Sequence, residues 1–178
     1  IENGTTLKGT ITSDVTLTAG STYKLSGEYI VEDGATLNIE AGVKIISIYD
    51  DIVDYILVKQ GGKINAVGTS SAPIVMTSEK EEPGAWGGIH ICGKAHTNAE
   101  GGKGSSEIGG ATYGGNDDAD NSGTLKYVRV EYSGYAFDSE HEANGITFYG
   151  VGNGTTVEYC QAYKGSDDGF EFFGGSVN

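Results

Sequence analysis

Acidic residues occur at two spacings in this sequence that could do chemistry, and the first is typical of metal binding. Asp118, Asp120 and Ser122 stand at alternate positions before a glycine, and Asp117 directly precedes them. Oxygen ligands at alternate positions, followed by a glycine turn, suit calcium. An EF-hand also requires a bidentate glutamate at the twelfth position, where this chain has Arg129. The pattern therefore predicts either a calcium site of another type or a solvated acidic turn.

The second spacing could serve glycoside hydrolysis. Asp167 and Asp168 stand close to Glu171, and polysaccharide hydrolases use one carboxyl group to protonate the leaving oxygen and another to activate water. The Gly-His-Gly and Arg-Ile-Lys segments of polygalacturonase-type enzymes are absent. A lyase would need a basic residue beside a bound calcium ion, and the chain has only one arginine, Arg129. The competing interpretation is that both aspartates cap a tight turn.

Aromatic and polar residues in two outward-facing rows are a third candidate. Strand alternation predicts one row of His90, Thr147 and Glu171, and a second of Cys92, Tyr149 and Phe173. Exposed aromatic rows give flat platforms for sugar rings, although the same stacking can simply stabilise the fold. The predicted ligand-binding residues are His90, Tyr149, Glu171, Phe173 and Tyr135.

Composition limits the fold and the partners. The chain has 178 residues, which suits one domain over 1–178, and 30 of them are glycine. The formal net charge of −14 argues against a nucleic-acid ligand, because the surface repels phosphate. No apolar run approaches the ~20 residues of a membrane-spanning helix. Two cysteines, Cys92 and Cys160, are too few for a disulfide scaffold, and their opposite alternation argues against a bond between them.

Internal repeats determine the predicted architecture. The segment beginning at Val31 recurs at Val58 as the pattern V-x-x-G-[AG]-x-[LI]-x-[IA]. A second unit, bounded by glycines, recurs at residues 88–93, 145–150 and 169–174, and Leu125 aligns with Val157 in a third repeat. Each copy alternates with period two, as expected of a strand with one buried face. Repeats of this length predict a solenoid.

The expected fold is an all-β, right-handed parallel β-helix. Helical apolar stripes are absent, and Gly, Asn, Asp, Ser and Thr fill the turns. About seven coils of ~22 residues would fit the chain, with Phe170 and Phe172 pointing inward. A sandwich or barrel is the alternative, but its strands need not resemble one another.

Three segments interrupt the repeat and are expected to be inserted loops: 47–55, 94–122 and 135–143. Insertions in a solenoid project from one side and often build the binding face. The last residues complete a repeat unit with no polar capping coil after it, so the chain is expected to be the N-terminal part of a longer solenoid.

Several segments together resemble a known family. They include PGAWGGIHICGKAHTN, YGGNDDADNSGTLKYVRVEYSGY and GSDDGFEFFGGSVN. These are similar to secreted or lipid-anchored surface proteins of Bacteroidota, a largely uncharacterised group of lipoproteins with an expected right-handed β-helix. The resemblance covers nearly the whole chain and implies an extracellular or outer-membrane location. It implies no specific activity.

These observations favour a non-enzymatic cell-surface protein. We expect it to bind a glycan or a protein partner through acidic loops and aromatic rows, with calcium as the one candidate cofactor. The first alternative is a polysaccharide-degrading hydrolase or lyase that uses Asp167, Asp168 and Glu171. The second is a structural spacer that binds no ligand.

Overall fold

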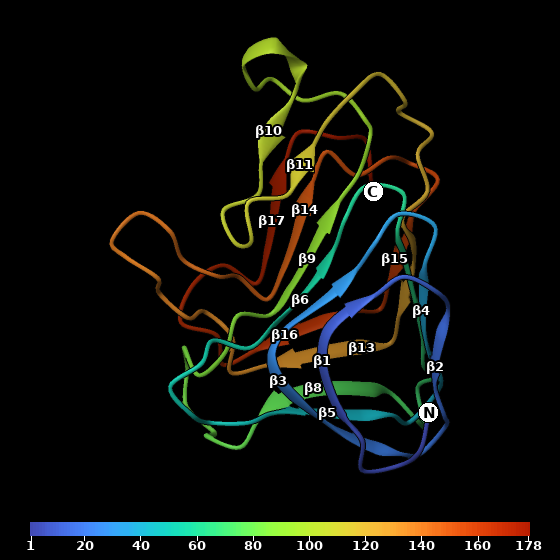
Figure 1. The fold of residues 1–178 in the computed structure, drawn as a ribbon, viewed down its shortest axis with the longest axis vertical. Coiled ribbons are helices and arrows are strands. Elements are labelled where there is room, and N and C mark those ends of the chain that lie inside the picture. The colour runs from blue at the N-terminus through green and yellow to red at the C-terminus, as the bar shows by residue number, and fades with distance from the viewer.

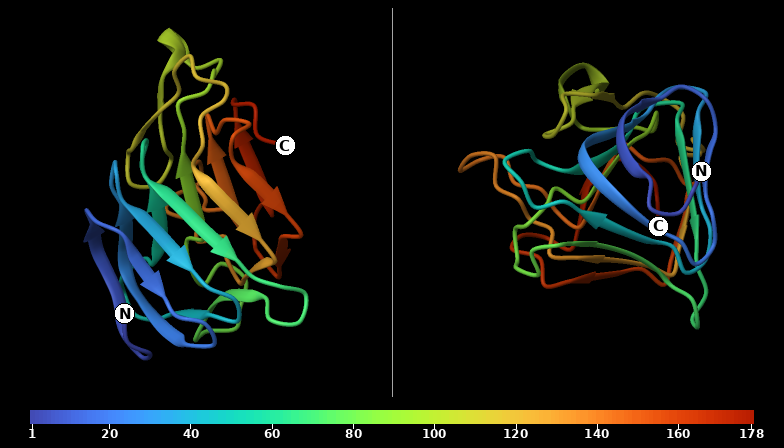
Figure 2. Two further views of the ribbon diagram at one scale, coloured as in Figure 1. Left: turned by 90° about the vertical axis from the view of Figure 1, so that its right-hand side faces the viewer. Right: turned by 60° about the horizontal axis from the view of Figure 1, so that its bottom comes forward.

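Short alternating strands separated by glycine-rich turns wind this chain into a parallel β-helix. The computed structural model describes residues 1–178 and places the strands on three faces around one core (Figures 1 and 2). The predicted all-β solenoid is thereby confirmed. The one helical element is a 3₁₀ turn, Glu100–Gly102. No helix is long and apolar enough to cross a membrane.

The three faces can be described by their strands. Face I contains the first halves of β1 (Thr6–Ile11) and β3 (Thr22–Val31), then β5 (Lys44–Ser47), β8 (Ile74–Ser78), β13 (Val128–Glu131) and β16 (Gln161–Tyr163). Face II contains the second halves of β1 and β3, then β6 (Tyr55–Val58), β9 (Ile89–Cys92), β14 (Ile146–Tyr149) and β17 (Phe170–Phe173). Face III contains β2 (Val15–Leu17), β4 (Thr36–Ile39), β7 (Lys63–Val67), β12 (Gly123–Lys126) and β15 (Thr156–Glu158).

The strand register follows the sequence repeats. All pairings within the three faces are parallel, and the repeats identified the partners correctly. The confirmed pairs are Val31 with Val58, Leu37 with Ile64, Ile146 with both Ile89 and Phe170, and Leu125 with Val157. Faces I and II have six rungs and face III has five, so the expectation of about seven coils was too high. The loops between strands take up the remaining residues.

Stacked apolar side chains fill the interior. Leu37, Leu125 and Phe148 are fully buried, as inward positions on successive rungs should be. Phe172 stacks on Phe148 with ring centroids 5.0 Å apart. However, Phe170 and Phe172 are 38% and 56% exposed, because β17 is the last rung of face II and no further strand stacks on it along the solenoid axis. Both residues keep the predicted inward orientation, in register with the interior residues Ile146 and Phe148, but they are not covered.

The two cysteines are free, in agreement with the sequence. Cys92 is fully buried on the outer side of face II, beneath the 94–122 loop. Cys160 packs at the edge of the main core, which lies inside the solenoid. The two side chains thus lie on opposite sides of the sheet wall.

Loops gather at one corner of the solenoid, where the chain passes from face I to face II. Four successive rungs are connected there by residues 48–54, 79–88, 132–145 and 164–169. The 94–122 loop leaves from the other end of face II, between β9 and β12. It forms an antiparallel hairpin of β10 (Gly104–Ser105) and β11 (Thr112–Tyr113). Figure 1 shows this hairpin and the 132–145 loop projecting beyond the strands.

Candidate functional site

The corner between faces I and II is a continuous, hydrogen-bonded surface. We call it the loop corner, defined by residues 48–54, 79–88, 132–145 and 164–169. Backbone amides connect its neighbouring loops, for example from Gly84 to Ser133 at 2.9 Å and from Ser166 to Ser133 at 3.1 Å. Trp86, which is 1% exposed, donates its indole N–H to the carbonyl of Glu131 at 2.7 Å. These contacts fix the loops in register along the solenoid axis, as the strands are fixed.

A buried carboxylate holds the first of these loops. Asp54 is 1% exposed and accepts hydrogen bonds from the Ser47 hydroxyl at 2.7 Å and from the Gly27 amide at 2.5 Å. Burial raises the pKa of Asp54, and the hydrogen bonds from Ser47 and Gly27 oppose that increase. The side chain therefore ties the 48–54 loop to the preceding coil.

A cleft with aromatic and acidic walls opens on the loop corner. We call it the aromatic cleft; its volume is about 320 Å³. Its lining residues come from three loops: Ile48, Tyr49, Asp50, Asp51, Ile52, Val53, Lys80, Pro83, Gly84, Ala85 and Tyr135. The Tyr49 side chain is 56% exposed, and the Lys80 ammonium lies 4.5 Å from the centre of its ring. Aromatic rings beside carboxylates are the groups that pair with the faces and hydroxyls of sugars.

An acidic cluster draws its side chains from the loop corner, from the 94–122 loop and from β17. It consists of Glu107, Glu142, Asp167, Asp168 and Glu171, whose charges act on one another. Burial raises the pKa of both Glu107 and Glu171, and the nearby negative charges raise each pKa further. The charge of His141 opposes this increase at Glu107, and the hydrogen bond from Asn144 opposes it at Glu171. Three of these acids, Asp167, Asp168 and Glu171, are the predicted catalytic trio. The side chains of Asp167 and Asp168 are exposed and accept no hydrogen bond, so the turn-capping interpretation is wrong.

One buried amide points at this acidic cluster. Asn144 is 1% exposed, and its Nδ2 donates to Glu171 and, at 3.2 Å, to the Thr147 hydroxyl. Its Oδ1 is buried and has no hydrogen-bond partner. Most buried polar atoms in native proteins are paired, so this oxygen calls for an explanation.

The predicted outward rows exist, but they are largely covered. His90 stands in register with Thr147, and Tyr149 with Phe173, as expected. The 94–122 loop folds back over these strands and buries Ile108 and Tyr113 against Tyr149. His90 and Tyr149 are fully buried, which contradicts their prediction as an exposed sugar-binding row.

The remaining predicted ligand-binding residues lie at the margins of this covered surface. Tyr135 lines the aromatic cleft, and its ring packs edge-on against Phe137 with centroids 5.0 Å apart. Phe173 is half-buried and stacks on Tyr149 at 5.0 Å. The structure therefore separates the five residues. Tyr135 faces the aromatic cleft and Glu171 the acidic cluster, whereas His90 and Tyr149 are buried beneath the loop and Phe173 stacks at their edge.

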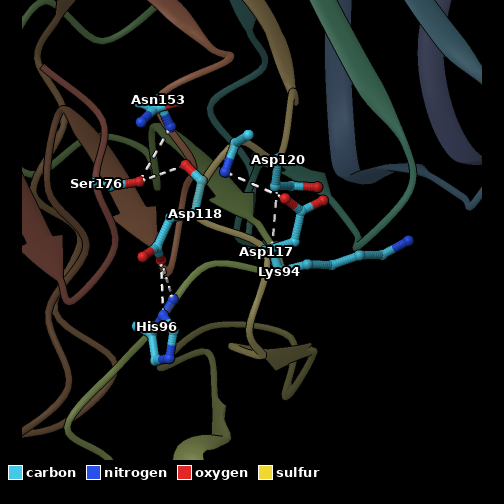
Figure 3. Close-up of polar contacts among 8 residues, drawn as sticks. Lys94, His96, Asp117, Asp118, Asp120, Asn153 and Ser176 are labelled. Carbon is cyan, nitrogen blue, oxygen red and sulfur yellow. Dashed lines mark hydrogen bonds and ion pairs between the residues drawn. The ribbon is translucent and has the colours of Figure 1, made fainter.

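The predicted calcium ligands make hydrogen bonds in the structure (Figure 3). Asp118 Oδ1 accepts from both the amide and the ring of His96, and its carbonyl accepts from Ser176 at 2.6 Å. Asp120 Oδ2 accepts from the Lys94 amide at 3.1 Å. Asp117 Oδ1 accepts from the amide of Ala119, two residues on.

The calcium site stays a prediction, because these residues are held in hydrogen bonds within the chain. Calcium needs six to eight converging oxygens, whereas no three His, Cys, Asp or Glu side chains of the chain are grouped to hold a metal. Ser122 is buried and offers its hydroxyl to Asp120 at 3.4 Å. As they stand, these residues fasten the 94–122 loop to the neighbouring coils.

Sequence reasoning missed Tyr49, Lys80 and Asn144 of the loop corner, and Glu107 of the 94–122 loop. Tyr49 and Lys80 lie in segments without a recognised motif, and Glu107 and Asn144 lie in or beside insertions. The acidic segment 47–55 around Tyr49 was visible in the sequence as an interruption of the repeat. Nothing in the sequence indicated that 79–88 and 132–145 stack against it.

Comparison with known proteins gives one match. The family model described as a pectate-lyase-like β-helix domain matches residues 9–178. No curated protein and no solved structure matches the chain.

Proposed function

Because the chain belongs to the pectate-lyase-like β-helix domain family, whose members fit a role with polysaccharides, we propose that it is a non-enzymatic glycan-binding protein. Its place of action in this proposal is the cell exterior, either secreted or lipid-anchored at an outer membrane. This agrees with the resemblance to Bacteroidota surface proteins.

The aromatic cleft is the observation that carries this proposal. Tyr49 and Tyr135 bring rings from two different loops, and Asp50 and Asp51 supply hydroxyl acceptors beside them. The cleft lies on the side of a rigid solenoid and is built from stacked loops, so a long polymer can lie along it without a large conformational change. Binding then costs little loop entropy.

The first prediction tests this cleft directly. Replacing Tyr49 with alanine should weaken glycan binding about tenfold or more, because the exposed ring is lost as a stacking surface. Binding would be measured by titration calorimetry against neutral and charged polysaccharides. Tyr159→Ala is the matched control, since Tyr159 is 68% exposed and lies outside the cleft.

Each outcome of this experiment has a defined meaning. Equal loss of binding in both variants would contradict the cleft as the site. If the wild-type chain bound no polysaccharide, the proposal would fail, and a protein partner or a spacer role would replace it. Repeating the titration with calcium and with EDTA tests whether calcium orders the 94–122 loop for binding.

A second candidate function is polysaccharide hydrolysis, which one observation favours. Glu107 and Glu171 both have raised pKa values, and a general acid needs this property near neutral pH. New reducing ends that disappear in Glu171→Gln, while the variant stays folded, would establish an enzyme. Product formation that is unchanged in Glu171→Gln, or absent in the wild type, would exclude this route.

A further inference from the structure

We propose that Asn153 is a site of spontaneous deamidation, and that the isoaspartate formed there weakens the attachment of the 94–122 loop. This reaction modifies the chain itself and does not depend on the proposed glycan binding. Three asparagines in the sequence directly precede a glycine: Asn3, Asn144 and Asn153. The structure distinguishes Asn153 from the other two by its hydrogen bonding and its exposure.

Deamidation of an Asn-Gly pair is an intramolecular reaction that needs only water. The glycine nitrogen attacks Cγ of the asparagine side chain, and glycine favours this attack because it has no Cβ to obstruct the approach. A bond forms between the glycine nitrogen and Cγ, the bond from Cγ to Nδ2 breaks, and Nδ2 leaves as ammonia with the proton of the attacking N–H. Water then opens the resulting succinimide at either carbonyl, which gives aspartate or isoaspartate. The glycine N–H must therefore be free to lose its proton.

The turn at Asn153 meets this requirement. The Thr155 amide donates to the Gly152 carbonyl at 3.1 Å, so Asn153 and Gly154 occupy the two central positions of a turn, and both are exposed. The Gly154 amide donates no hydrogen bond to the rest of the chain, and the Asn153 side chain makes none. The attacking nitrogen and the amide that it attacks are thus both accessible and unengaged.

The other two Asn-Gly pairs are held by hydrogen bonds. The Gly4 amide donates to the Thr22 carbonyl at 2.8 Å, and the side-chain oxygen of Asn3 accepts from the Thr22 amide at 2.8 Å. The Gly145 amide donates to the Asp168 carbonyl at 2.9 Å, and the asparagine before it is 1% exposed. These contacts must open before the glycine nitrogen can attack, so the folded chain protects both sites.

The turn at Asn153 also holds the 94–122 loop (Figure 3). The Asn153 amide donates to the Asp118 carbonyl at 2.8 Å, and the Ser176 hydroxyl bonds to both residues. Gly154 packs so closely on the loop that a Cβ on it would lie 2.5 Å from a backbone oxygen. Isoaspartate places an additional carbon atom in the main chain and adds a negative charge. The tightly packed turn cannot accommodate that atom without giving up contacts to the loop.

Incubation of the folded chain in mildly alkaline buffer tests which asparagine reacts. Asn3 and Asn153 are matched within one molecule, because both begin the tripeptide Asn-Gly-Thr and both are exposed. Peptide mass spectrometry follows the gain of one dalton at each site, and enzymatic methylation identifies isoaspartate. We expect Asn153 to react about tenfold faster than Asn3, where two hydrogen bonds must first open. In concentrated urea the two rates should become equal, because unfolding removes the protection.

The effect on the loop is measured on the deamidated fraction, separated from unreacted protein by anion exchange. This fraction should melt about 2–4 °C lower than fresh protein and be cleaved faster by protease within 94–122. Fresh Asn153→Asp carries the added charge without the additional main-chain carbon, so it should melt close to the wild type. Asn153→Gln forms the cyclic intermediate much more slowly and should keep its melting temperature during the same incubation.

The outcomes that would overturn the proposal are distinct. Equal rates at Asn3 and Asn153 in the folded chain would show that the structure does not select the site, as would reaction at Asn153 only in urea. A deamidated fraction with the melting temperature and protease resistance of fresh protein would overturn the weakened attachment of the loop. An equal loss of stability in incubated Asn153→Gln would assign the damage to another residue.

Discussion

At the scale of single residues, burial rather than residue type decides what His90 does. Its Nε2 lies 2.7 Å from the carbonyl oxygen of Gly87, which can only accept, so Nε2 carries the proton. Nδ1 is then free to accept from the Tyr149 hydroxyl at 3.2 Å. Both ring nitrogens are satisfied in the neutral form. A histidine that looked like a ligand in the sequence is thus part of the packing beneath the 94–122 loop.

This burial predicts an acid-sensitive fold. Desolvation lowers the pKa of His90 from 6.5 to about 4, against the opposing hydrogen bond to Gly87. The unfolded chain therefore takes up this proton first, so the stability that neutral His90 provides is present above pH 6.5 and is lost as the pH falls toward 4. The loss should be on the order of 3 kcal/mol.

Urea unfolding at pH 7 and pH 4.5 measures this loss, with His90→Gln as the test variant. Glutamine can donate to Gly87 and accept from Tyr149 without taking up a proton, so its stability should decline less on acidification. His96→Gln, at an exposed histidine, is the control and should follow the wild type. An identical decline in His90→Gln and the wild type would show that other groups cause the acid sensitivity.

At the scale of elements, the sequence predicted what repeats and missed what is inserted. Parallel rungs stack like residues on like, so the copy at Val58 identified the partner of Val31 without any structural information. Alternation also placed Tyr149 on the outer side of its strand correctly. Outward does not mean exposed, however, because the 94–122 loop returns over that strand. The residues of the 94–122 loop have no periodicity that could predict this contact.

The returning loop should be a cooperative part of the fold, and Ile108 tests this. Its side chain is 2% exposed and packs against face II in a cluster with Leu57 and Tyr149. Ile108→Ala should cost about 2–5 kcal/mol of unfolding free energy, measured by urea denaturation. Thr112→Ala, at an exposed position of the same hairpin, should change it by less than about 0.5 kcal/mol.

Where Ile108→Ala destabilises the structure is as informative as how much unfolding free energy it removes. If the loop merely rests on the surface, Ile108→Ala will leave the global unfolding midpoint unchanged and only increase protease cleavage within 94–122. That result would contradict a cooperative role for the apolar cluster that the loop forms with Leu57 and Tyr149 of face II.

At the scale of the whole molecule, negative charge is the dominant electrostatic feature. The net charge is −14, and most of the ion pairs involve exposed side chains that contribute little stability. Self-repulsion of this kind opposes the compact state and is reduced by salt. The acidic cluster is therefore a local concentration of negative charge on a molecule that is negative overall. Ion effects on stability must be separated into general screening and specific binding.

Thermal unfolding in matched salts makes that separation. Sodium chloride should raise the melting temperature by about 2–4 °C, the shift that ~1 kcal/mol produces in a domain of this size. Calcium should raise it no more than magnesium at equal ionic strength, because Asp118 and Asp120 already accept hydrogen bonds from His96 and Lys94. To bind the ion, they would have to give up these contacts. A calcium-specific rise that disappears in Asp118→Asn with Asp120→Asn would instead establish that the 94–122 loop rearranges around a bound ion.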